Sequence, residues 1–242
     1  LCGWMLVRSN MRKNREAADV REQHEDPETV ADAVRYTIDD VASTMRRITQ
    51  IYDRVLIAVS RENRKALKEV VQQSEELYEA SRERKYNIMP TLMHMKESEL
   101  NTAQYYVQVV DYMSEIAKAL LHITRPCFRH IDNNHEGFSK EQVDDLMRIN
   151  DDVEEIFSRI NVMLQRNDFG DLDLILELRD ELFGSIADAM ASQLRRIRDK
   201  TTSTKTNMLF LAILSETKTI VLQSRNLVKS QRYFLQHQTR QQ

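Results

Sequence analysis

Apolar side chains recur at steps of three and four along residues 100–122, which is the period of an α-helix. They are Leu100, Ala103, Val107, Val110, Met113, Ala117 and Leu121. A second stripe with the same period is polar and consists of Gln104, Gln108, Asp111, Glu115, Lys118 and His122. A helix of this kind buries one face in a core and offers the other to water, a partner or an ion.

The rest of the chain also favours helices over strands. Its 242 residues include only 4 Gly and 3 Pro, with 30% charged residues, whereas a sheet protein needs turn residues about every ten positions. The sequence therefore predicts an all-α fold. Similar stripes place six long helices at about 28–59, 61–90, 98–124, 140–165, 171–200 and 207–237.

Several local signals predict where these helices begin and end. Ser60 is the predicted N-cap of the second helix, and a kink or break is expected at Pro90. Pro126 is expected to end the third helix near 124, ahead of a loop at 130–137. Ser139 and Gln142 then form a predicted capping box at the start of the fourth helix, and 167–170 reads as a turn.

The helix starts fall into two sets of three that are offset by about 110 residues, which suggests a repeated architecture. We therefore predict two tandem antiparallel three-helix bundles, one at 28–137 and the other at 138–242. Residues 1–27 are a predicted lead-in and connector. Residues 1–7 are apolar and a cluster of basic residues follows them, as on the cytoplasmic flank of a membrane segment. The alternative is an amphipathic lead-in that packs on the bundle.

Basic residues also gather at 194–242, and acidic residues gather at 142–188. A basic segment could meet nucleic acid or anionic lipid. No aromatic-rich basic strip accompanies this charge, so we expect basic helices beside acidic ones and no nucleic-acid partner. Cys2 and Cys127 are too few for a disulfide framework or a zinc site, which fits a reducing compartment.

The third predicted helix carries Asp111-Tyr-Met-Ser-Glu115, a pair of acids four residues apart. A six-helix chain of two three-helix repeats with such a pair resembles PhoU, the bacterial phosphate-uptake regulator, although the order of the acids is reversed here. Segments 85–92, 105–112, 125–135 and 214–218 resemble more closely the PhoU-like cytoplasmic region that follows the transmembrane part of some bacterial inorganic phosphate transporters. The transporter that carries such a region would be of the PiT or the sodium/phosphate cotransporter type. The resemblance covers about 28–234.

The resemblance implies a regulatory or accessory domain at the cytoplasmic face of the bacterial inner membrane that modulates inorganic phosphate uptake. Its partner would be a transmembrane phosphate transporter, in the same chain or separate, with the first residues close to the membrane. The expected contact surface is the polar stripe at 104–122 with the basic face of the last helix, and long apolar stripes are compatible with a homodimer. Two alternatives stay open: a free-standing PhoU-type adaptor, and a metal-binding helical-bundle protein.

The resemblance also implies binding of a divalent or iron cation through the acidic motif. Asp111 and Glu115 share one helix face, where like charges are unfavourable unless something compensates them. A cation could compensate them, helped by Asp39 or Asp40 of the first helix, and so could Lys118. A solvated charged face is the favoured interpretation. The corresponding positions of the second repeat, 215 and 219, are Ser and Thr.

The sequence gives less support to a metal site at 130–135 or to an enzymatic function. His130, Asp132 and His135 could ligate a metal, but loop capping is the favoured role for this Asn-rich segment. The chain has no Gly-rich phosphate loop, nucleophile elbow, zinc-protease pair or dinucleotide fingerprint. It also lacks the Glu-x-x-His motif of di-iron bundles. We therefore expect that the protein is not an enzyme.

Overall fold

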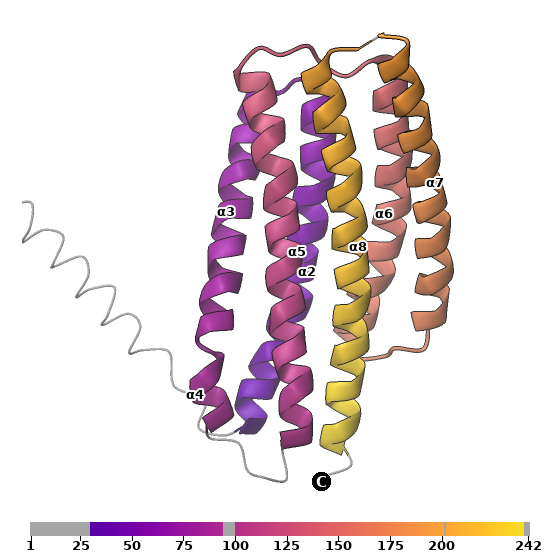
Figure 1. Ribbon diagram of the computed structural model, residues 1–242. Helices are drawn as coiled ribbons and strands as arrows, with labels where there is room; N and C mark the ends of the chain where they lie inside the picture. Colours follow the sequence, from indigo (N-terminus) through magenta and orange to yellow (C-terminus); the bar gives the residue numbers. More distant parts are fainter. Residues whose placement is uncertain (1–29, 94–99, 201, 240–242) are drawn as a thin grey trace, which may run out of the picture. The chain divides into compact units, whose positions relative to one another are not determined.

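The computed structural model describes residues 30–93, 100–200 and 202–239, and these residues contain helices and turns without a strand. The helices are α2 (Val30–Ser60), α3 (Arg64–Tyr86), α4 (Ile88–Met93), α5 (Leu100–Asp132), α6 (Lys140–Arg166), α7 (Leu172–Arg198) and α8 (Thr204–Thr239) (Figure 1). The predicted all-α class is confirmed. Contacts divide the chain into Leu1–Tyr36 and Thr37–Gln242, and the first unit contributes only the start of α2 to the described residues. All the other described residues belong to the second unit.

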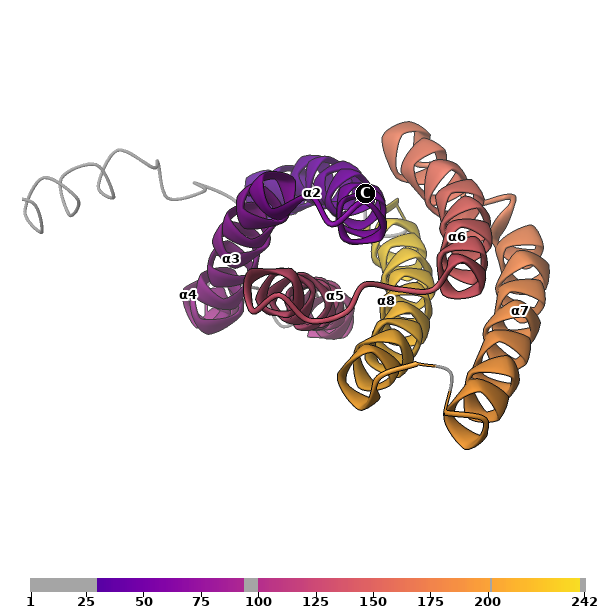
Figure 2. The same ribbon diagram turned by 90° about the horizontal axis from the view of Figure 1, so that it is seen from above.

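Within Thr37–Gln242 the long helices form two groups of three, α2 with α3 and α5, and α6 with α7 and α8 (Figure 2). Helix α8 packs against α5 as well as against α6 and α7, so it joins the two groups. Its direction is antiparallel to α5. Tyr105 stacks on Tyr233 with ring centroids 5.4 Å apart, and Ser230 donates a hydrogen bond of 2.9 Å to Gln108.

One apolar core runs through both groups. Every long helix contributes fully buried side chains to it, the largest being Tyr52, Phe157, Phe210, Phe234 and Met45. The apolar stripes explain this core, because each long helix presents a continuous apolar face that only neighbouring helices can cover. Two bundles that share a core hold the surface residues of α3, α5 and α8 in a fixed arrangement.

Two predicted helix boundaries are wrong. Helix α5 does not stop near 124 but continues through Pro126 to Asp132, so His130 is helical rather than part of a loop. The proline removes a backbone donor, yet Ile123 and Cys127 on either side of it are buried. The Thr124 hydroxyl also bonds Ser74 of α3 at 2.6 Å. Packing against α3 therefore outweighs the local signal.

The second wrong boundary is the start of α3. Ser60 is the last residue of α2, and the N-cap is Asn63, whose side chain accepts a hydrogen bond of 3.1 Å from the Ala66 amide. The expected break near Pro90 occurs slightly earlier, where α3 ends at Tyr86 and the short α4 begins. These differences shift helix ends and leave the order of the long helices as predicted.

The predicted capping box is confirmed. Ser139 accepts a hydrogen bond of 3.3 Å from the Gln142 amide, and the Gln142 side chain accepts one of 2.9 Å from the Ser139 amide. The predicted turn at 167–170 is present as well, with Asn167 in the left-handed conformation at φ 51°. Both features are local in sequence, which is why sequence alone could locate them.

Candidate functional site

The polar stripe of α5 lies half-exposed along one side of the first helix group. Lys85, near the end of α3, forms an ion pair with Asp111. The Lys118 ammonium lies 3.7 Å from the Glu115 carboxylate, one turn away on the same helix. Each acid of the predicted pair therefore has a lysine partner, and the like charges at 111 and 115 are compensated within the protein.

This arrangement affects the protonation of Lys85. The hydrogen bond to Asp111 raises the pKa of the Lys85 amine, partial burial opposes the rise, and the charges of Asp111 and Glu115 add to it. The amine is therefore firmly cationic at neutral pH. An ammonium in this position occupies the place that a cation would take beside Asp111.

Asp40, on α2, is the other predicted ligand with a described side chain. It forms an ion pair with Arg84 of α3, and the Thr44 hydroxyl lies 3.5 Å from its carboxylate. Asp39 lies in α2, but its side chain is outside the described part of the structure. The predicted cation site at Asp111, Glu115, Asp39 and Asp40 stays a prediction, and its three described carboxylates all have basic partners.

Two predicted site residues are held by neighbouring residues of α3. Arg84 forms an ion pair with Asp40 of α2, and Lys85 forms a separate ion pair with Asp111 of α5. Neither basic residue was among the predicted site residues. Their signal is their position in the last turn of α3, where cations interact favourably with the helix dipole.

Helix α8 borders the other side of the stripe. Besides the bond between Ser230 and Gln108, His122 lies 3.5 Å from Glu216. Part of the basic charge of α8 packs on aromatic rings, since the Lys218 ammonium lies 5.1 Å from the Phe183 ring centroid. The stripe is thus a mixed-charge surface that can exchange ion pairs with a partner.

The segment at 130–135 offers little to a metal. His130 is buried, and its Nε2 lies 2.7 Å from the Glu136 carbonyl oxygen. Asp132 accepts a hydrogen bond of 2.6 Å from Arg64, and His135 lies 3.2 Å from the Lys205 ammonium. In the described ranges, no group of three or more His, Cys, Asp or Glu side chains is placed to hold a metal ion.

Membrane-related predictions rest mainly on residues 1–27, which lie outside the described part of the chain. Among the helices that the structure describes, none is both long and apolar enough to cross a bilayer. One partly buried ion pair agrees with the expectation that basic helices lie beside acidic ones. Arg196 of α7 contacts Asp145 of α6 at 3.0 Å.

No protein-family model matches the sequence, and none of the curated proteins matches it. Among solved structures, the phosphate transport system regulatory protein PhoU from Streptococcus pneumoniae is similar, with a TM-score of 0.69. The match covers 86% of this chain and 97% of that chain, at 9% sequence identity. The described chain therefore has a PhoU-like all-α fold, which confirms the fold predicted from the resemblance.

Proposed function

We propose that this protein modulates inorganic phosphate uptake as a regulatory cytoplasmic domain of an inner-membrane phosphate transporter. The observation that carries the proposal is the likeness of fold to a phosphate transport regulator over 86% of the chain. Fold alone does not imply function, so the transporter context rests on the sequence resemblance and on the nature of the α5 surface.

The polar stripe suits a reversible contact. The side chains of Asp111 and Lys85 are 45% and 43% exposed, and ion pairs at such positions contribute only about 0.2–1 kcal/mol. A charged group of a partner can therefore replace one member of such an ion pair at a small cost in free energy. Cytoplasmic loops of membrane proteins are rich in Lys and Arg, and such side chains would compete with Lys85 and Lys118 for the two carboxylates.

The first test concerns the native gene product. An antibody to this domain would detect the endogenous protein in separated membrane and soluble fractions. A band well above 28.5 kDa confined to the membrane fraction supports a transporter appendage. A soluble band near 28.5 kDa would instead support the free-standing adaptor.

The second test concerns the stripe. Cells that carry the Asp111→Asn/Glu115→Gln variant should show altered phosphate uptake at normal protein levels. A matched control is Asp151→Asn/Glu155→Gln on α6, which removes two exposed acids at the same spacing. Equal uptake in both variants would exclude the stripe as the contact surface. Unchanged uptake after removal of the whole domain would refute the proposed function.

A further inference from the structure

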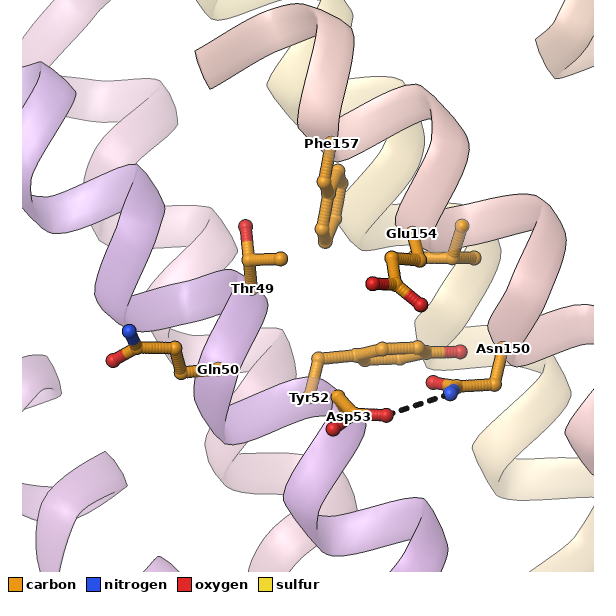
Figure 3. Close-up of a pocket in the computed structure, with 8 residues that line it drawn as sticks. Thr49, Gln50, Tyr52, Asp53, Asn150, Glu154 and Phe157 are labelled. Atoms are coloured by element: carbon orange, nitrogen blue, oxygen red, sulfur yellow. Dashed lines mark hydrogen bonds between the residues drawn. The ribbon is translucent and has the colours of Figure 1, made fainter.

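A cavity of about 130 Å³ lies between α2 and α6, apart from the polar stripe. Thr49, Tyr52 and Asp53 line it from α2, and Asn150, Glu154 and Phe157 line it from α6. Figure 3 shows the two carboxylates and the Asn150 amide beside the buried Tyr52 ring. The cavity thus connects the first helix of one group with the first helix of the other.

One buried oxygen in this cavity lacks a partner. Asn150 is 5% exposed, and its Nδ2 donates a hydrogen bond of 2.8 Å to Asp53. An ionised carboxylate only accepts hydrogen bonds, so this contact fixes the orientation of the amide. The Oδ1 atom is then left without a hydrogen-bond partner among the described residues. A buried orphan of this kind costs about 1–3 kcal/mol unless water or a ligand satisfies it.

The cavity also carries two carboxylates, although Arg47 and Arg54 border Asp53 on the side that faces away from it. In the described ranges, neither Asp53 nor Glu154 belongs to an ion pair. The neighbouring arginine, Arg54, turns away from the cavity toward Gln73 and Glu69 of α3. Two carboxylates on facing helices focus a negative potential that attracts cations.

We propose that this cavity binds one hard divalent cation, such as Mg²⁺, Mn²⁺ or Ca²⁺, through Asp53, Glu154 and the Asn150 amide oxygen. Carboxylate and amide oxygens are the ligands that these ions prefer. The volume of about 130 Å³ far exceeds the roughly 15 Å³ that one water needs, so the ion keeps several waters as further ligands. Such an ion fastens α2 to α6.

This site is independent of the regulatory function proposed above and of the acids on α5. Two carboxylates and several retained waters make a weak site, with a dissociation constant of about 10⁻⁴–10⁻³ M. Because the ion binds only the folded chain, it also raises the melting temperature. The Tyr52 and Phe157 rings, 6.2 Å apart and edge to face, form the apolar wall that keeps the ligands in place.

The test is a titration of the metal-free full chain with Mn²⁺, in which the electron paramagnetic resonance signal reports the unbound ion. We expect saturable binding of one ion per chain. Asp53→Asn and Glu154→Gln should each weaken it at least tenfold. Asn150→Asp should tighten it, because a third carboxylate replaces the neutral amide, and this gain cannot come from a failure to fold.

Two controls make the result specific. Glu181→Gln removes one exposed charge from α7 and should leave the affinity unchanged. Asp111→Asn/Glu115→Gln should also leave it unchanged. Three outcomes would overturn the proposal: no saturable binding up to about 10 mM, which lies above the expected range; an Asn150→Asp affinity no better than that of the wild type; or loss of binding only in the α5 variant.

Discussion

The phenol of Tyr52, on α2, lies 2.8 Å from the hydroxyl of Thr217, on α8, with both side chains buried. Thr217 donates its own proton to the Ile213 carbonyl at 2.8 Å, so the phenol is the donor in this pair. Burial raises the pKa of Tyr52 well above its ordinary value, so the phenol is protonated at neutral pH. The bond links the two three-helix groups.

This pair predicts unequal effects for two conservative changes. Tyr52→Phe removes a donor and leaves Thr217 with one remaining hydrogen bond, so it should lower the free energy of unfolding by about 1 kcal/mol. Thr217→Val leaves the buried phenol without a partner and should cost about 1–3 kcal/mol. Urea unfolding of both variants and of the double variant measures the difference. A smaller cost for Thr217→Val would show that the phenol finds another acceptor.

A second prediction concerns Arg196, on α7. Its guanidinium contacts Asp145 of α6 at 3.0 Å, with both side chains 16% exposed. It also donates to Gln193 at 2.9 Å and covers the Phe210 ring at 5.4 Å. Arg196→Met should therefore lower the free energy of unfolding by about 2–4 kcal/mol, because it breaks a largely buried network.

Lysine is not an adequate replacement here, because its point charge cannot reproduce the planar fork of arginine. Arg196→Lys should fall between Arg196→Met and the wild type. The matched control is Arg198→Met, which removes a 74% exposed guanidinium two residues away and should change stability by less than about 0.5 kcal/mol. Equal effects at 196 and 198 would contradict the assigned role of the buried network.

Structural features that depend on residues close in sequence could be predicted, whereas those that depend on contacts between distant residues could not. Amphipathic stripes and the Ser139 cap depend on residues close in sequence, and these features were predicted correctly. The extension of α5 past Pro126 depends on packing against α3, including the hydrogen bond between Thr124 and Ser74, which are 50 residues apart. No local sequence pattern predicts such a contact. Tertiary contacts override propensity in such places.

The same distinction holds for the site residues. Asp111 and Glu115 were found because two acids four positions apart are visible in the sequence. Lys118, the partner of Glu115, was also predicted, because it lies on the same helix. Lys85, the partner of Asp111 on α3, was not predicted, because that contact crosses between helices. The α2–α6 cavity brings together Asp53 and Asn150, which are 97 residues apart, and no periodicity connects them. Each half of that cavity looks like an ordinary polar position on a helix.

His135 provides a prediction about pH. Desolvation, the Lys205 charge and the His130 ring lower the pKa of His135 below its ordinary value. The folded state therefore binds its proton less readily than the unfolded state, so this residue's contribution to stability is present above pH of about 6.5 and is lost as the pH falls below it. The Lys205 ammonium, 3.2 Å away, donates only to the neutral imidazole.

Removing that ammonium should therefore raise the pKa of His135. The expected result for Lys205→Met is a titration midpoint closer to the ordinary value, measured by NMR of the imidazole Cε1 proton. Lys200→Met removes an equal charge from the exposed end of α7 and should leave the midpoint almost unchanged. Equal shifts in both variants would mean that net charge, not the contact, governs the titration.

Lys200 itself carries the last prediction. It follows the C-cap Asp199 of α7 in the left-handed conformation, with φ 52°, and its amide donates to the Ile197 carbonyl at 3.2 Å. This conformation costs a residue with a Cβ about 1–2 kcal/mol, and glycine adopts it freely. Lys200→Gly should raise the free energy of unfolding by about 0.5–1 kcal/mol, because the greater freedom of glycine in the unfolded chain offsets part of the gain.

Lys200→Ala is the matched control, since it removes the same amine but keeps the Cβ. It should not stabilise the protein. Thermal and urea unfolding of the two variants separate the backbone effect from the loss of charge. If alanine stabilised the chain as much as glycine does, the gain would come from relieving repulsion among the basic residues near 195–205, and the left-handed strain at Lys200 would carry no measurable cost.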